Sequence, residues 1–261
     1  METHSMGVKL SVIIITFNEE VNIRRCLESV KPVADEVIVV DSYSTDRTKE
    51  ICLAFGATVV EHPFEGYIEQ KKFALSLAQY THILSVDADE VVSEELCRNI
   101  KAAKENWSAD VYDINRLTNY CGTWVKHSGW FPDWKTRLFD RTKAEWGGDN
   151  PHDQVFPLPG TRHVKMPGTL LHYSYASIRQ HLNQINKFSD YSLQVMIRKN
   201  KRVTLLDMIV RPKFKFFRTY ILKRGFMDGF AGFCIATLAA NYEFVKYAKL
   251  YMYYQERKKQ R

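Results

Sequence analysis

Four short apolar runs alternate with helical segments over residues 9–86, and this alternation restricts the fold more than any other feature of the sequence. The runs are rich in Val and Ile, as in strands that are buried on both faces of a parallel sheet. Helical segments between the runs indicate parallel strands joined by right-handed crossovers. The sequence therefore predicts an α/β fold with a mostly parallel sheet flanked by helices. The predicted strands are 9–16, 36–40, 57–61 and 82–86, and the predicted helices are 21–30, 47–55 and 68–78.

Polar residues follow three of these strands at the point where each strand ends, in segments 16–19, 41–44 and 87–90. In open α/β sheets, ligands bind outside the carboxyl ends of the strands. Each segment alone is explained equally well as a turn or a helix cap. Three such segments at one edge of a sheet predict a binding site.

Two aspartates, Asp87 and Asp89, end the fourth strand one residue apart. We expect their side chains to point the same way, because side chains alternate along a strand. Two carboxylates on one face suit a hard cation such as Mg²⁺, which completes its shell with phosphate oxygens. The motif Gly-x-Gly-x-x-Gly is absent after the first strand, which disfavours a dinucleotide-binding domain. We therefore predict a metal and a diphosphate ligand, with a helix cap or solvated turn as the alternative.

The middle of the chain, residues 120–168, is irregular and rich in Trp and Gly. Exposed aromatic faces suit sugar rings, although a Trp buried in the core is the commoner case. Residues 147–153 predict a loop that brings an acid and an imidazole together. Further strands are predicted at 111–118, 137–139 and 169–172, and a long helix at 178–199; the tryptophans are Trp124, Trp130, Trp134 and Trp146.

Basic charge is concentrated at the C-terminus. Residues 201–261 contain 14 Lys and Arg against 4 Asp and Glu, whereas residues 1–200 contain 23 against 26, for a total of +7. We predict a catalytic domain over 1–200 and a basic, aromatic-rich helical tail over 201–261. Such a tail is typical of helices on an anionic membrane surface, and docking on the protein's own core is equally compatible. Nucleic acid is not an expected partner, because no nucleic-acid-binding motif accompanies the charge.

Cysteine usage and hydropathy indicate the compartment. The five cysteines are widely spaced and include no Cys-x-x-Cys pair, which favours reduced thiols in a cytoplasm. The segment before the first predicted strand, residues 1–7, is short and polar, unlike a secretory leader. The longest uncharged stretch near the C-terminus, 229–242, is shorter than the roughly 20 residues that span a bilayer. We expect a cytoplasmic protein, and peripheral association with the inner face of the cell membrane remains open.

Four motifs within the first ninety residues, in this order, resemble glycosyltransferase family 2, whose fold is called GT-A. Three later segments and the pair His152-Asp153 are similar to the lipopolysaccharide-core glucosyltransferase branch of that family. Two positions depart from it: Ile15 stands where many relatives have proline, and Asp153 where the branch generally has glutamate. The four motifs are IITFNE (14–19), VVDSYSTDRT (39–48), QKKFAL (70–75) and VDADE (86–90), and the later segments are RLF (137–139), LHY (171–173) and RGFMDG (224–229).

The resemblance implies a metal-dependent inverting glycosyltransferase that moves a hexose from a nucleotide diphosphate sugar, usually a uridine diphosphate sugar, to a lipopolysaccharide-core or other lipid-linked or surface-glycan acceptor. It implies that Asp89 ligates Mg²⁺ or Mn²⁺. We expect His172 to complete the metal shell, and a purely structural histidine at a strand end is the alternative. Asp153 would be the general base, oriented by His152. The implied donor-binding residues are Thr16, Phe17, Glu19, Asp41, Lys71 or Lys72, Asp87 and Arg137.

Two other classes of protein remain open. A nucleotidyl or phosphoryl transferase would also use paired aspartates, although an aspartyl phosphatase usually carries its Asp-x-Asp after the first strand and not the fourth. A catalytically silent glycan-binding or membrane-scaffold protein would bind sugar nucleotides weakly or not at all.

Overall fold

A computed structural model describes residues 7–149 and 152–259, without the side chains of Asp149, His152 and Asp153. The chain forms two compact units. The first unit contains the chain up to Arg116 together with Asp133–Tyr173, and the second contains Leu117–Pro132 together with the chain from Ser174 onward.

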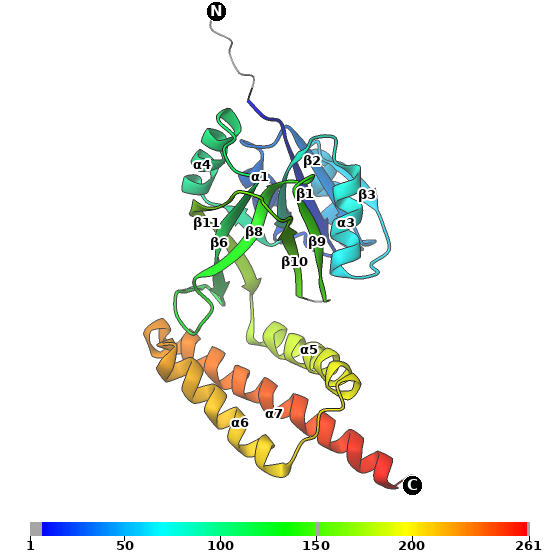
Figure 1. The fold of residues 1–261 in the computed structure, drawn as a ribbon, viewed down its shortest axis with the longest axis vertical. Helices are drawn as coiled ribbons and strands as arrows, with labels where there is room; N and C mark the ends of the chain where they lie inside the picture. Colours follow the sequence, from blue (N-terminus) through cyan, green and yellow to red (C-terminus); the bar gives the residue numbers. More distant parts are fainter. Residues whose placement is uncertain (1–6, 150–151, 260–261) are drawn as a thin grey trace, which may run out of the picture. The chain divides into compact units, whose positions relative to one another are not determined.

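The first unit is built on a sheet in which the described strands run in the order β3-β2-β1-β4-β8-β6-β11-β5 (Figure 1). Strands β1 to β4 run parallel to one another, as predicted, while β8 pairs antiparallel with both β4 and β6, and β5 pairs antiparallel with β11. The predicted α/β fold class is confirmed. The strands are β1 (Leu10–Thr16), β2 (Glu36–Asp41), β3 (Thr58–Glu61), β4 (His82–Asp87), β5 (Glu90–Val92), β6 (Val111–Tyr120), β8 (Asp133–Asp140) and β11 (His163–Tyr175).

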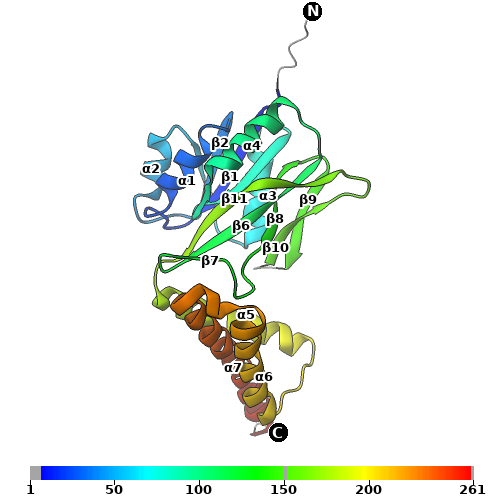
Figure 2. The ribbon, with the colours of Figure 1, turned by 90° about the vertical axis from the view of Figure 1, so that its left-hand side faces the viewer.

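Both faces of the parallel strands are buried. Along β1, Val12 and Ile14 pack against helices α1, α2 and α4, whereas Ile13 packs with Ile68 of helix α3 on the other face. Figure 2 shows these helices on the two sides of the sheet. Burial on both faces explains why β1 is a continuous apolar run instead of an alternating one. The helices are α1 (Ile23–Val30), α2 (Thr48–Ala54), α3 (Tyr67–Leu77) and α4 (Glu94–Glu105).

A β-hairpin of β9 (Ala144–Asp149) and β10 (His152–Pro157) occupies the segment where a loop was predicted at 147–153. That prediction is wrong. Trp146 and Val155 lie opposite each other in the hairpin and are both buried in the core that contains α3. Their burial outweighs the turn-forming tendency of the Gly, Asn, Pro and Asp residues in this segment.

The second unit consists mainly of helices and also contains the short strand β7 (Thr123–Val125). Its long C-terminal helix begins at Gly229. No helix in the described part of the chain combines the length and hydropathy of a membrane span. The helical segments are α5 (Ile178–Arg198), α6 (Leu205–Phe217), the π-helical turn η1 (Arg218–Leu222), the 3₁₀ turn η2 (Gly225–Asp228) and α7 (Gly229–Lys259).

The RGFMDG segment holds residues 126–128 through the Asp228 side chain, within this second unit, and we call these contacts the Asp228 clamp. The Asp228 carboxylate is buried and accepts hydrogen bonds from the backbone N–H of Lys126 and of His127 and from the Ser128 hydroxyl. A side chain at Gly232 would overlap the carbonyl oxygen of Gly225, so the start of α7 lies directly against the 3₁₀ turn. These contacts assign the motif a structural role inside the second unit.

Candidate active site at the strand ends

The segment Asp87-Ala88-Asp89-Glu90 spans a strand end, a turn and the start of the next strand. Asp87 is the last residue of β4, Ala88 and Asp89 form the turn, and Glu90 begins β5. The backbone N–H of Asp87 donates to the Glu90 carboxylate (2.9 Å), which holds the turn closed. The alternation expected for Asp87 and Asp89 therefore does not apply, and the two carboxylates have different partners.

Two cations bind the Asp87 carboxylate. Lys71 from α3 lies 2.9 Å from one of its oxygens, and Arg137 from β8 lies 2.6 Å from the other. Both cationic side chains are about 95% buried, whereas 26% of the Asp87 side chain is exposed. Burial alone would raise the pKa of Asp87, but the charges of Arg137 and Lys71 outweigh it and hold that pKa well below its usual range. Asp87 is therefore ionised.

Glu90 is a buried member of this site to which the sequence analysis assigned no role. Its side chain is fully buried and accepts from Arg137 (2.9 Å) and Arg116 (3.4 Å). Arg116 also pairs with Asp133 at 2.7 Å. An unpaired buried carboxylate would be very unfavourable, so this chain of charges is needed for Glu90 to be buried. The only signal in the sequence was an acid directly after the Asp-x-Asp motif. The two arginines that it contacts lie on later strands, so the sequence does not show this pairing.

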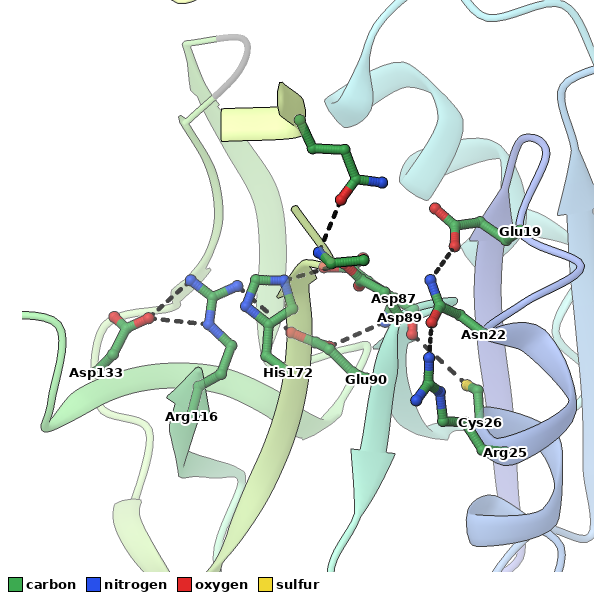
Figure 3. A network of polar contacts seen from close by, with 12 residues as sticks. Glu19, Asn22, Arg25, Cys26, Asp87, Asp89, Glu90, Arg116, Asp133 and His172 are labelled. Atoms are coloured by element: carbon green, nitrogen blue, oxygen red, sulfur yellow. Dashed lines mark hydrogen bonds and ion pairs between the residues drawn. The ribbon is translucent and has the colours of Figure 1, made fainter. Parts of the chain in front are cut away.

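Asp89 and His172 meet although 83 positions separate them in the sequence. Strand β5 pairs with β11 so that Glu90 lies opposite His172, and the backbone N–H of Tyr173 donates to the carbonyl of Asp89. This register brings Nε2 of His172 to 3.1 Å from a carboxylate oxygen of Asp89 (Figure 3). Burial lowers the pKa of His172, but the Asp89 charge outweighs that effect and the pKa is raised.

The pair Asp89–His172 has the composition and spacing of two metal ligands. A carboxylate oxygen and an imidazole nitrogen both coordinate ions such as Mn²⁺. Two neighbouring ligands about 2.1 Å from an octahedral ion stand about 3.0 Å apart, close to the observed 3.1 Å. No group of three or more His, Cys, Asp and Glu in the described part of the chain is arranged to hold an ion. An ion held by this pair would need its remaining ligands from phosphate or water.

The ends of β1 and β2 are joined by side-chain hydrogen bonds. Thr16 lies opposite Asp41 in the sheet, and both oxygens of the buried Asp41 carboxylate accept from Ser44. The Ser44 hydroxyl in turn accepts from the backbone N–H of Asn18. In the described part of the chain, the buried Thr16 hydroxyl has no hydrogen-bond partner. An unsatisfied hydroxyl beside a strand end is well suited to contact a polar ligand.

A second polar chain runs from Glu19 through Asn22 to Arg25 (Figure 3). The Arg25 guanidinium stacks on the Tyr173 ring, 3.9 Å from its centroid. Burial, and to a smaller extent the nearby charge of Asp89, raise the pKa of Glu19 to about 7, although its hydrogen bond with Asn22 acts in the opposite direction. Glu19 was predicted as a site residue, whereas Asn22 and Arg25 were not, because one polar face of a short helix carries no specific signal.

The remaining predicted residues differ in their placement. The Phe17 ring is 57% exposed at the end of β1, and Lys72 is exposed on α3 beside the buried Lys71. The backbones of His152 and Asp153 lie in β10, and their side chains are outside the described part of the chain. The Thr16, Asp41 and Asp87 strand ends are brought together as predicted, because β1 pairs with both β2 and β4.

Comparisons with known proteins agree with this geometry. The family model described as Glycosyl transferase family 2 matches residues 11–164. The uncharacterized glycosyltransferase RP128 of Rickettsia prowazekii is 33% identical over 254 residues, covering 93% of this chain and 86% of that protein. The lipopolysaccharide core biosynthesis glycosyltransferase LpsC of Rhizobium meliloti is 27% identical over 251 residues, covering 93% and 92%.

A solved structure shares the fold. The mannosyltransferase PcManGT of Pyrobaculum calidifontis, in complex with GDP-Man and Mn²⁺, superposes with a TM-score of 0.56 at 14% identity, covering 95% of this chain and 88% of that one. The predicted GT-A fold and the predicted family resemblance are therefore confirmed. Since the family model matches more than half of the sequence and RP128 matches nearly all of it, this chain belongs to glycosyl transferase family 2.

Proposed function

We propose that this glycosyltransferase moves a hexose, with inversion at the anomeric carbon, from a nucleotide diphosphate sugar to a lipopolysaccharide-core or other lipid-linked acceptor. The observation that carries the proposal is the meeting of Asp89 with His172 beside the partly exposed, ionised Asp87. Similarity to LpsC over most of both chains supports the acceptor class. In this proposal residues 1–200 are the catalytic domain, and residues 201–261 are a tail that holds the enzyme on the cytoplasmic face of the membrane.

Asp89 and His172 would hold a divalent cation, Mg²⁺ or Mn²⁺. When bound, such an ion stabilises the negative charge that develops on the departing diphosphate. Asp87 is fixed between Lys71 and Arg137, so it would present its exposed edge to the donor without changing its protonation state. Lys71 and Arg137 would act on the donor indirectly, by holding Asp87 in place, because both side chains are buried against its carboxylate.

Thr16, Phe17, Glu19 and Asp41 would surround the nucleoside of the donor, for which uridine is the first candidate. The unpartnered Thr16 hydroxyl supports a polar contact there, and the exposed Phe17 ring offers a face on which a base can stack. Asp41 would support this pocket by holding Ser44, which holds the backbone of Asn18.

The acceptor hydroxyl must lose a proton as its oxygen attacks the anomeric carbon. We assign this proton to the Asp153 carboxylate, with His152 as its orienting neighbour. The new bond joins the acceptor oxygen to the anomeric carbon, while the bond from that carbon to the diphosphate oxygen breaks. A general base of this kind contributes about 10²–10⁴-fold to the rate.

A thermal-shift screen with uridine, guanosine and thymidine diphosphate sugars, with and without Mn²⁺, tests the donor and metal. We expect one nucleotide to raise the melting temperature, and the increase to require Mn²⁺ and Asp89. A donor at a hundredfold excess over its Kd stabilises the folded state by about 2.7 kcal/mol, which such a screen detects easily. Absence of any shift would contradict the proposal, and binding without sugar transfer would favour the silent glycan-binding alternative.

A further inference from the structure

Helix α6 presents a stripe of large apolar side chains that the described part of the second unit leaves exposed. The stripe consists of Leu206, Val210, Phe214, Phe217 and Ile221, and each of the five is between 45% and 67% exposed. Their spacings of 4, 4, 3 and 4 residues place them on one side of the helix that continues into η1. No residue of α6 is buried. We call these five residues the apolar stripe.

A second exposed apolar patch lies at the turn between η2 and α7. Phe226, Met227 and Phe230 are 50%, 56% and 75% exposed. The Phe230 ring stacks on Phe233 of α7, and Phe233 packs edge-on against Phe216 of α6. The patch is therefore packed against the same helix that carries the apolar stripe, within the second unit. Exposed apolar surface of this extent is rare in proteins that face only water.

The charges around this surface are mainly positive. Within residues 205–233, all of which the structure describes, there are six Lys and Arg and two acids. Asp207 accepts from Thr204 and Arg211, and Asp228 is buried in its clamp, so neither acid presents free negative charge. The six bases are Arg211, Lys213, Lys215, Arg218, Lys223 and Arg224.

We infer that the apolar stripe and the patch at Phe226–Phe230 insert into the headgroup region of an anionic lipid bilayer. Amphipathic helices with basic flanks lie in this region with their apolar face buried about 5–10 Å deep. A second copy of this chain would set two such basic surfaces against each other, which disfavours self-association through the same face. This inference rests on the proposed function, in which the tail holds the enzyme on a membrane, and deepens it by naming the side chains that enter the lipid and the charge of that lipid.

Vesicle co-sedimentation of the full chain tests this inference. We expect binding to vesicles of phosphatidylglycerol mixed with phosphatidylcholine, and much weaker binding to phosphatidylcholine alone. The triple variant Leu206→Ser, Phe214→Ser, Phe217→Ser should bind the anionic vesicles about a hundredfold more weakly, because it removes three inserted side chains. Each of Lys213→Gln and Arg218→Gln should weaken binding about fivefold.

Leu53→Ser is the matched control, because Leu53 on α2 is 62% exposed and Leu206 is 67% exposed. Leu53→Ser should bind vesicles like the wild type, whereas Leu206→Ser alone should bind them more weakly. Vesicle binding that is absent in the wild type, or unchanged in the triple variant, overturns the inference. So does a wild-type dimer in light scattering that the triple variant converts to a monomer, since a second copy would then cover the stripe.

The donor thermal-shift screen on the same variants separates this inference from the proposed function. The triple variant should retain the full nucleotide-sugar shift while losing vesicle binding. Vesicle binding without any donor shift in the wild type would instead overturn the proposed sugar transfer and leave the proposed membrane surface standing.

Discussion

The strand ends of the first unit bury charge, whereas helix α6 of the second unit exposes apolar surface. At the strand ends, Glu90 is fully buried and Arg137 almost so, and each has a partner of opposite sign. On α6, Leu206 and Phe214 are more than half exposed. Both arrangements are unfavourable in a protein that only has to fold, because buried charge and exposed apolar area each reduce stability.

The two regions are therefore suited to different kinds of ligand. Buried and paired charges form a rigid polar surface that keeps its shape when a charged ligand arrives. An exposed apolar face is stabilised only when something other than water covers it. Five substitutions, taken from the largest expected effect to the smallest, test this contrast.

Asp89→Ala should have the largest effect and reduce sugar transfer at least about 10⁴-fold, because it would remove one of the two proposed ligands of the metal that stabilises the departing diphosphate. The variant should remain folded, since 23% of the Asp89 side chain is exposed. Steady-state kinetics with saturating Mn²⁺ measures the loss. Asp190→Ala on α5, with a 62% exposed side chain, is the control and should transfer normally. Retention of a tenth of the activity by Asp89→Ala would refute the ligand assignment.

Asp153→Asn should reduce turnover about 10²–10⁴-fold, because an amide cannot take up the proton of the attacking hydroxyl. Donor binding should be unchanged, so the loss should appear in kcat and not in the thermal shift. Asp153→Glu, which restores a carboxylate, should recover much of the rate. Near-normal turnover in Asp153→Asn would mean that another group is the base.

Arg137→Met should destabilise the fold by about 3–5 kcal/mol, because it leaves the Asp87 and Glu90 carboxylates partly unpaired in a buried site. Urea denaturation measures the change. Lys135→Met on the same strand is the matched control, since the Lys135 side chain is 41% exposed and its loss should cost less than about 1 kcal/mol. A similar small effect at both positions would show that the buried charges are not coupled as described.

Glu19→Gln should flatten the pH dependence of stability. The pKa of Glu19 is raised from 4.5 to about 7, so the folded state holds this proton more tightly than the unfolded state does. Its contribution is therefore fully present below about pH 4.5 and is lost as the pH rises through about 7, a change of up to about 3 kcal/mol. Urea denaturation of both proteins at pH 5 and pH 8 checks this. Equal pH slopes in the two proteins would argue against a raised pKa.

Leu206→Ala should change the free energy of unfolding least, by less than about 0.5 kcal/mol, because the side chain contacts mainly water. The same substitution at the fully buried Leu250 of α7 should cost about 2–5 kcal/mol. Thermal or urea denaturation of both variants measures the contrast. A large loss of stability in Leu206→Ala would mean that the apolar stripe is part of the core.

Local pattern was enough to predict the first half of the fold. The runs around Ile13, Val39 and Leu84 are buried strands, and their parallel pairing follows from the helices between them. The acids Asp41 and Asp87 are the last residues of β2 and β4. Prediction failed at residues 147–153, where the burial of Trp146 and Val155 is decided by a distant helix.

The sequence by itself determined that carboxylates gather at one edge of a parallel sheet. It also determined that basic and aromatic residues alternate in the tail. Both properties depend on residues that are neighbours in the sequence. Only the tertiary structure decided that His172 faces Asp89, that Glu90 is buried between Arg116 and Arg137, and that the apolar side of α6 is exposed. Each of these depends on antiparallel pairing or helix packing between segments far apart in the chain, and the local sequence does not specify such long-range contacts.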